Sequence, residues 1–497
     1  MTARVGELVH SIDPLPLPDP FSPPPLPPPG PTHRRLIAHP VRRYPQRAFP
    51  YADLVATNAA RSRHDPEYDI TDTGVFSADA GYWDVQVEYH KNAPNDILIV
   101  VTVTNQSPHA ATLHLLPQAW FRNSWSWGRQ GEDFLDEPPV MSEVRGGGDD
   151  GGMATVSCRH PVLGEFCFSA EPMRRGAGAA TAKGSKEEGH SDGGGDEKGL
   201  PGRLLFTNNE TNTTLLWGDA AGPPSTPYVK DAFHRYVVDG EEDAVNPDRT
   251  GTKCGILYVL RDVPPGESHI VRLRLVNPDA DTDTAGKKSQ SQDGCVDGNG
   301  TESDGGGNDG GGQDAAKGCG GDATSGSVHS GEESKASFFG AWFAKACADR
   351  KEEADSFFHA RQLTRLPQEL RLLQRQAYAG LMWSKQFFHY SIKQWLEGDP
   401  AQLTPPPQRW TGRNSQWTHM FNRDVISMPD KWEYPWFAAW DLAFHMVPFA
   451  VVDPHYAKFQ LVLFMREWYM HPNGQLPAYE WALGDVNPPV CWDEWIQ

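Results

Sequence analysis

The sequence predicts an α+β protein with an antiparallel β-sandwich first and consecutive helices second. Short segments of alternating apolar and polar residues fill the N-terminal half, separated by Pro, Gly and Asn turns. After residue 337 the apolar period becomes helical. A Gly/Asp/Ser-rich run over residues 279–336 divides the two patterns. It is expected to be a disordered linker or insert, because it holds too little apolar surface to offset the entropy of ordering.

The sandwich is expected over residues 44–278, where each alternating segment is typical of a strand that buries one face. The expected strands lie near 83–89, 97–103, 113–115, 119–121, 203–207, 213–217, 255–260 and 270–276. Low-complexity stretches near 146–152 and 175–200 are interpreted as expansions of surface loops.

The helical domain is expected over residues 337–497. Apolar residues recur every three to four positions from Leu366 to Phe388, which predicts a long amphipathic helix. Further helices are expected around 340–360, 435–450 and 455–470, separated by loops that Pro and Gly mark.

Residues 1–43 form a Pro-rich leader that can adopt polyproline II at most. It is interpreted as disordered, with an SH3- or WW-type ligand as the alternative. No run approaches 18 apolar residues, and the N-terminus lacks the order of a secretory signal. A cytoplasmic location is therefore the default expectation. Sequons at Asn105, Asn209, Asn212 and Asn299 carry little weight without an export signal.

The net charge of −20 argues against a nucleic-acid partner or an anionic membrane, since both require basic patches. The seven Cys residues show no CxxC and no zinc-like spacing, and the His residues show no ligand spacing. No metal or organic cofactor is expected. Protein partners stay unknown. Eleven of the 17 Trp residues follow residue 380, which directs attention to that region.

The segment KWEYPWFAAWDLAFH, residues 431–445, carries the candidate chemistry. Pro435 suits the first turn of a helix, where its missing N–H is harmless. From there Phe437, Asp441 and His445 follow at spacings of four residues and are expected to share one face.

Trp436 and Trp440 are expected to lie beside Asp441. A carboxyl group among indole rings is poorly solvated, which raises its pKa and suits a general acid that works near neutral pH. The competing interpretation is structural, because an Asp on an aromatic helix is often a hydrogen-bond partner. His445 can likewise be a packed histidine.

The next segment, 466–490, crowds polar and aromatic residues into a loop-rich stretch that is typical of the rim of a sugar pocket. These residues are Trp468, Gln475, Tyr479, Glu480, Trp481, Asp485 and Asn487.

WEYPWFAAWDLAFH and NGQLPAYEWALGDVNPP resemble the catalytic core of glycoside hydrolase family 63. Upstream segments agree with it: YPQRAFPY (44–51), DPEYDITDTGVF (65–76), ILIVVTVTNQSP (97–108), LHLLPQAWFRNSWSWG (113–128) and KQWLEGDP (393–400). The resemblance covers nearly all of 44–490 except the low-complexity inserts. It is nearest to the bacterial-type, mannosylglycerate-hydrolase-like branch.

The resemblance implies that the helices are the first part of an (α/α)6 barrel and that the enzyme hydrolyses α-glycosidic bonds with inversion. By position, Asp441 would be the general acid. The implied sugar contacts are Tyr434, Trp436, Trp440, His445, Gln475, Tyr479 and Trp481. The substrate would be an oligosaccharide or glycoside. α-Glucosides, glucosylated mannose oligosaccharides and mannosylglycerate-type compounds all suit the family.

Inversion needs a second carboxylate about 6.5–9.5 Å away as general base. The resemblance places that Glu in later barrel helices, beyond Gln497, so the chain is expected to be a fragment with a truncated barrel. The alternative function is a catalytically inactive carbohydrate-binding protein that lacks the general base.

Overall fold

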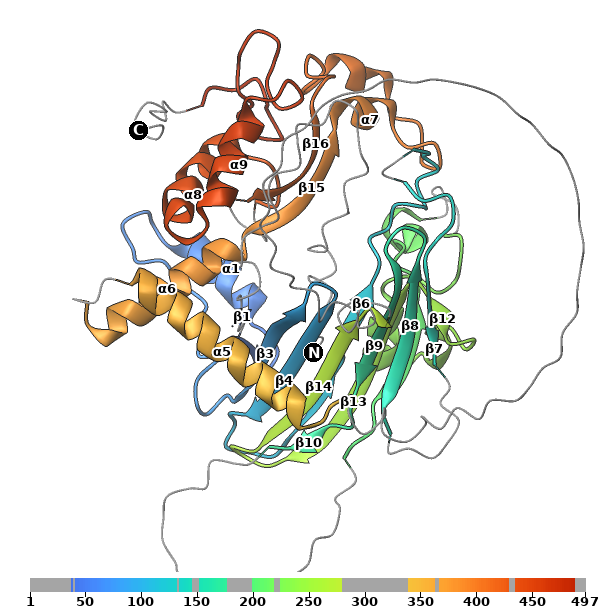
Figure 1. The fold of residues 1–497 in the computed structure, drawn as a ribbon, viewed down its shortest axis with the longest axis vertical. Helices are drawn as coiled ribbons and strands as arrows, with labels where there is room; N and C mark the ends of the chain where they lie inside the picture. The colour runs from blue at the N-terminus through green and yellow to red at the C-terminus, as the bar shows by residue number, and fades with distance from the viewer. Residues whose placement is uncertain are drawn as a thin grey trace, which may run out of the picture.

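The computed structural model describes residues 37–38, 41–131, 134–144, 152–176, 199–218, 224–278, 338–362, 366–428 and 434–487. Antiparallel sheets occupy the N-terminal part and helices predominate after residue 340, so the class is α+β, as predicted (Figure 1). The predictions for residues 1–36, for most of 175–200 and for 279–336 lie outside the described residues, as does most of 146–152.

The larger sheet has ten strands in the order β1-β3-β4-β14-β9-β8-β7-β12, with β2 on β3 and β10 on β14. All of its pairings are antiparallel. The strands are β1 (Ile37–Ala38), β2 (Val41–Pro45), β3 (Tyr82–Ala93), β4 (Asp96–Asn105), β7 (Val140–Glu143), β8 (Ala154–His160), β9 (Gly164–Ala170), β10 (Arg174–Arg175), β12 (Thr250–Gly251) and β14 (Ser268–Val276).

The smaller sheet has β11, β13 and β5 in order, with β6 also on β13. Its strands are β5 (Ala111–Leu115), β6 (Gln118–Trp120), β11 (Arg203–Thr207) and β13 (Lys253–Val263). The two sheets share one core, to which Trp83 and Val101 contribute from the larger sheet and Ile256 and Tyr258 from the smaller. Alternating residues are buried over 82–87 of β3 and 99–105 of β4, because successive side chains of a strand point to opposite faces. Residues 37–278 are called the two-sheet region below.

One expected strand of this region is wrong. Residues 213–217 form the helix α2 (Thr213–Trp217), because the Asn212 side chain accepts a hydrogen bond from the backbone N–H of Leu215 and caps a helical turn. The apolar side chains of Leu216 and Trp217 consequently stay exposed instead of entering the core. The region also holds α1 (Tyr51–Ala60), α3 (Ala232–His234), η4 (Arg235–Asp239) and η5 (Glu242–Ala244).

Sequon asparagines in this region are structural. The Asn105 side chain is buried, and its amide donates to the carbonyls of His109 and Val263 at 2.8 Å each. The Asn209 amide donates to the Phe121 carbonyl, and the Asn212 amide to Asp231. A glycan attached at any of these nitrogens would replace a hydrogen bond that holds the fold. Asn299 lies outside the described residues.

Residues 338–487 are called the helical region. Its elements are α5 (Ala341–Arg361), α6 (Gln368–Met382), β15 (Lys385–Ser391), α7 (Ile392–Glu397), η7 (Pro407–Thr411), β16 (Phe421–Ser427), α8 (Ala439–Val452) and α9 (Pro454–Phe464). Among the described residues, no helix is long and apolar enough to cross a membrane. The helices predicted near 340–360 and 455–470 are confirmed as α5 and α9, although α9 ends earlier.

Two helical predictions are wrong in their extent. The helix expected from Leu366 to Phe388 ends at Met382, because residues 385–391 pair antiparallel with β16 along the whole strand (Figure 1). The helix expected from Pro435 begins at Ala439 instead. Ala438 is extended, with φ −136° and ψ 109°, and Pro435 therefore lies outside the helix.

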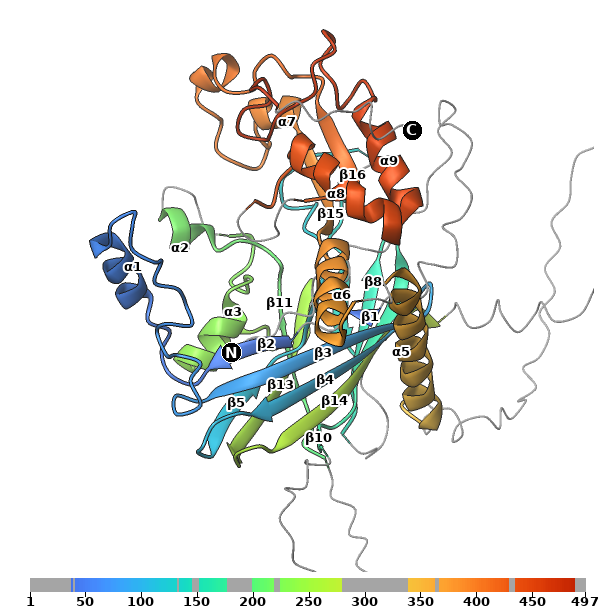
Figure 2. The same cartoon turned by 90° about the vertical axis from the view of Figure 1, so that its left-hand side faces the viewer.

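Helix α5 lies against the larger sheet and joins the two regions (Figure 2). Phe343 and Cys347 of α5 share a small buried cluster with Leu98 of β4. Lys351 of α5 forms an ion pair of 2.7 Å with Glu88 of β3. The contact is therefore apolar at one end and ionic at the other.

A second junction is formed by Arg129, which lies in the loop after β6. Its guanidinium donates to Asp399 Oδ1 at 2.6 Å and to the carbonyls of Gln394 and Gly398 at 2.8 and 2.6 Å. Gln394 belongs to α7, and Gly398 is its C-cap. One largely buried side chain thus supplies a donor to the Gly398 carbonyl at the end of α7, and a second donor to the Gln394 carbonyl, which also accepts the Gly398 N–H.

Arg129→Ala should lower the free energy of unfolding by about 2 kcal/mol, because it leaves the Asp399 carboxylate and the Gly398 carbonyl without this donor. Urea unfolding of the full chain measures the change. The control is Arg175→Ala, which breaks the exposed pair with Glu267 and should cost under about 1 kcal/mol. Equal midpoints for the two variants would contradict the role assigned to Arg129.

Candidate functional site

The two segments that carry the motif residues lie side by side at the start of α8. Ala438 and Tyr479 form an isolated antiparallel bridge, and the backbone N–H of Ala439 donates to the Ala478 carbonyl at 3.1 Å. A second bridge joins Tyr479 to Ala482 and closes a tight turn. The loop that was expected at the rim is thus attached to the N-terminal end of the helix that carries Asp441.

Three of the predicted sugar contacts form a continuous series of rings, called the aromatic row below. Tyr434 and Trp436 have ring centroids 5.2 Å apart at 89°, and Trp436 and Trp481 are 6.2 Å apart at 86°. Tyr434 and Trp481 are 45% and 47% exposed, so the row is open to solvent at both ends. Exposed aromatic rings fixed by one another are suited to binding the apolar face of a sugar.

Asp441 lies in the first turn of α8 and is partly buried. Burial raises the pKa of its carboxyl group, while the bond from its own backbone N–H lowers it by less. The expectation that Trp436 and Trp440 lie beside Asp441 stays a prediction. The Trp436 ring belongs to the aromatic row, and the centroid of the Trp440 ring lies 6.0 Å from that of Phe444, on an exposed face of the helix.

His445 is engaged with β16. Its Nδ1 lies 2.6 Å from Ser427 Oγ, which in turn lies 2.8 Å from Ser384 Oγ. Burial lowers the pKa of the imidazole, which favours the neutral ring. The side chain therefore ties α8 to the strand pair, as the packed-histidine interpretation allows.

Gln475 and Tyr479 shape the loop. The Gln475 side-chain amide donates to the Gly484 carbonyl at 3.1 Å, and its backbone N–H donates to Asn473 Oδ1 at 2.9 Å. Tyr479 forms both backbone bridges of the turn. The main structural contribution of these two residues is to hold the segment that carries Trp481.

Sequence reasoning placed Glu480 on the rim but missed its polar neighbours Arg413 and Asn414 beside Trp481. The Arg413 guanidinium lies over the Trp481 ring, 4.0 Å from its centroid, and 5.7 Å from that of Trp395. Burial raises the pKa of the Glu480 carboxyl, which the Arg413 charge opposes. Asn414, in the left-handed conformation at φ 60°, donates to the Glu480 carbonyl and accepts from the Leu483 N–H at 2.9 Å.

The only signal for this cluster in the sequence is GRNS at 412–415, a turn-like tetrapeptide before Trp417. A turn residue that tolerates the left-handed conformation could be predicted there. Its partner segment could not, because the contact joins residues far apart in the chain.

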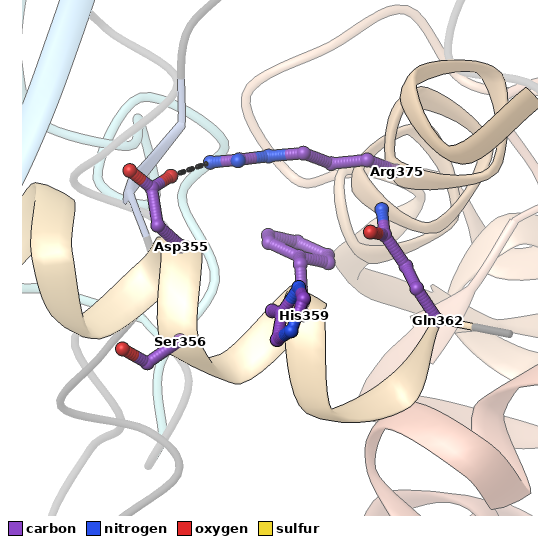
Figure 3. A pocket seen from close by; sticks show the side chains of 6 residues that line it. Asp355, Ser356, His359, Gln362 and Arg375 are labelled. Atoms are coloured by element: carbon purple, nitrogen blue, oxygen red, sulfur yellow. Dashed lines mark ion pairs between the residues drawn. The ribbon is translucent and has the colours of Figure 1, made fainter. Parts of the chain in front are cut away.

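A pocket of about 380 Å³ lies elsewhere, between α5 and α6 (Figure 3). It is lined by Asp355, Ser356, Phe358, His359, Gln362 and Arg375. Arg375 and Asp355 form an ion pair of 2.6 Å across it, so its charges are already paired. None of the predicted site residues lines this pocket. Among the described residues, no group of His, Cys, Asp and Glu side chains is arranged to hold a metal ion.

Acidification should destabilise the protein through His445. Its folded-state pKa lies below the ordinary value of 6.5, so the stability that the neutral ring contributes is present above pH 6.5 and is lost as the pH falls below it. His445→Gln should therefore flatten the pH dependence of the unfolding midpoint between pH 7 and about pH 5. His455→Gln, at an exposed position of α9, is the control and should leave it unchanged. An unaltered slope for His445→Gln would contradict the assignment.

No protein-family model matches the chain. The chain is 35% identical over 472 residues to the uncharacterized protein YMR196W of Saccharomyces cerevisiae. The match covers 93% of this chain and 37% of that relative, so the chain spans little more than a third of the relative's length.

Proposed function

We propose that the chain belongs to an inverting glycoside hydrolase that cleaves α-glycosidic bonds, with Asp441 as the general acid. The observation that carries the proposal is a partly buried carboxyl of raised pKa at the start of α8, next to a loop that presents the aromatic row. The resemblance to glycoside hydrolase family 63 supports the same role for this residue.

The electrostatics of Asp441 suit a proton donor. The N-terminal end of a helix favours the charged carboxylate, since the helix dipole is positive there. Burial acts in the opposite direction and has the larger effect on its pKa. A proton is therefore retained to higher pH than on an exposed Asp, which is what protonation of a departing sugar oxygen requires.

The exposed apolar faces of the helices support the proposal of an (α/α)6 barrel. Leu370, Leu372 and Leu373 of α6 are about half exposed, and Phe444, Val447 and Val451 of α8 are 43–51% exposed. In a barrel of helical hairpins, neighbouring helices cover such faces. We propose that these are its first helices, preceded by a β-sandwich, and that a Glu of a later helix serves as general base.

The substrate in this proposal is an oligosaccharide or an α-glycoside. A second candidate function is binding of carbohydrate without hydrolysis, and the aromatic row favours it. Exposed stacked rings bind a sugar whether or not a second carboxylate is present, whereas inversion requires one.

Asp441→Asn should strongly reduce turnover. In a form extended to the full length of the yeast relative, the loss should be about 10²- to 10⁴-fold, because the amide cannot supply a proton. The rate of the parent enzyme should fall as the pH rises through the raised pKa of Asp441. Release of glucose or mannose from α-glycosides measures both effects.

Residues 1–497 alone should release little sugar, since the proposed general base is absent from them. Ordinary turnover by this polypeptide would contradict the need for a later Glu. Undiminished turnover of the extended Asp441→Asn enzyme would contradict the assignment of the acid. Glu467→Gln, at an exposed position, is the control for changes that merely remove a carboxylate.

A further inference from the structure

We propose that Glu480 and Arg413 together bind one or two hydroxyl groups of a neutral sugar and so determine which sugar the site accepts. This inference builds on the proposed function. It gives a specific role to Glu480, which the sequence placed on the expected rim, and to Arg413, which the sequence did not single out. It commits to an uncharged monosaccharide unit, either free or at the end of an oligosaccharide.

The backbone around Glu480 is fixed from several sides. Its carbonyl accepts a hydrogen bond from the Asn414 side chain, and the Ala482 N–H donates to the Tyr479 carbonyl at 3.0 Å. The Ala478 N–H donates to the Leu483 carbonyl at 2.9 Å. The carboxyl group is therefore presented from a tight turn between two of the predicted sugar contacts, Tyr479 and Trp481. A group held this way loses little entropy on binding.

Arg413 is fixed in a different way. Its side chain is exposed, and its guanidinium carbon lies over the Trp481 ring, 4.0 Å from the centroid, and 5.7 Å from the centroid of the Trp395 ring. Trp395 packs against the apolar core of the helical region and also contacts Arg409, whose guanidinium carbon lies 4.8 Å from the centroid of its ring and which donates to its carbonyl at 2.8 Å. Stacking on an indole uses the face of a guanidinium and leaves the N–H groups at its edge directed sideways.

The two charges lie near each other without direct contact. Arg413 is close enough to oppose the rise in the pKa of Glu480. Within the part of the chain that the structure describes, however, the ion pairs of 4.0 Å or less do not include Arg413 with Glu480. A polar group that lies between them can bond to both.

The chemistry of that position selects a hydroxyl. A free anion would meet the Glu480 carboxylate and a cation would meet Arg413, so the opposite charges disfavour both kinds of ligand. A hydroxyl group accepts from the guanidinium and donates to the carboxylate at the same time. Hydrogen bonds to charged groups are the stronger kind, and partial burial of Glu480 strengthens them further.

The same arrangement predicts how binding depends on pH. The carboxylate form accepts the sugar hydroxyl, and its pKa is raised, so affinity should fall as the solution is acidified through that pKa. Arg413 and Tyr390 face the Glu480 carboxyl from other parts of the chain. The charges of Arg409 and Arg413 also lower the pKa of Tyr390. Burial raises the pKa of Tyr390, so its titration lies away from the acidic range.

The test measures sugar binding and not turnover. The full chain carrying Asp441→Asn is titrated with D-glucose and D-mannose by calorimetry, so that neither hydrolysis nor titration of Asp441 contributes. Adding Glu480→Gln should weaken the preferred sugar about tenfold, as expected for one lost hydrogen bond to a charged group. Adding Glu467→Gln instead should leave the affinity unchanged. The affinity of the parent should fall on acidification, whereas that of the Glu480→Gln variant should stay flat.

Deoxy sugars separate recognition from a purely structural role of Glu480. Of the 2-, 3-, 4- and 6-deoxyglucose series, the sugar that lacks the contacted hydroxyl should bind the parent and Glu480→Gln equally weakly. Equal affinity of both proteins for every sugar would overturn this inference and leave the hydrolase proposal standing. An equal loss for all the deoxy sugars would show a structural effect and overturn it as well. Failure of the parent to bind either hexose would overturn the sugar site itself.

Discussion

The backbone pairing of Ala438 with Tyr479 is the constraint on which the candidate site depends. Because Ala438 is held extended, α8 begins at the next residue, Ala439, and Asp441 falls in its first turn. The residues before Ala438 lie outside the helix, and the Trp436 ring contacts that of Trp481 beside the Ala438–Tyr479 bridge. A continuous helix from Pro435 would have carried Trp436 around the axis with Trp440 and separated it from the loop. The pairing of Ala438 with Tyr479 therefore determines that the Trp436 ring contacts Trp481.

Partial burial of acidic groups is the second theme of this region. The pKa values of Asp441, Glu480 and Asp424 are all raised, and in each case desolvation is the largest cause. Their other interactions differ. The Asp424 carboxyl accepts a bond from the Tyr469 hydroxyl at 3.1 Å, Glu480 faces an arginine, and Asp441 has the bond from its own N–H. Three partly buried carboxyls thus differ in their partners: Asp424 is bonded to a buried tyrosine, whereas Asp441 and Glu480 lie at the start of α8 and in the loop that pairs with it.

The sequence predicted the fold best where local pattern and tertiary packing agree. The alternation from Trp83 to Tyr89 predicts β3 because the same residues fill the shared core. Prediction failed where another interaction competed with the pattern. The Asn212 cap made a helical turn of an apolar run, and pairing with β16 converted the end of a helical stripe into β15. The Arg413 cluster gave almost no signal, because only the folded chain brings that arginine onto Trp481.

The hydrogen bonds of Arg129 affect whether the two regions of the protein can be separated. The arginine belongs to the two-sheet region but secures the end of α7, and α7 carries the Trp395 ring on which Arg409 and Arg413 are arranged. Three successive contacts thus connect a loop of the sheets to the guanidinium beside Glu480. The sheets therefore support the structure around the proposed carbohydrate site. In that proposal, dividing the protein within its Gly-rich run would disturb sugar recognition, even though every proposed contact residue lies in the C-terminal part.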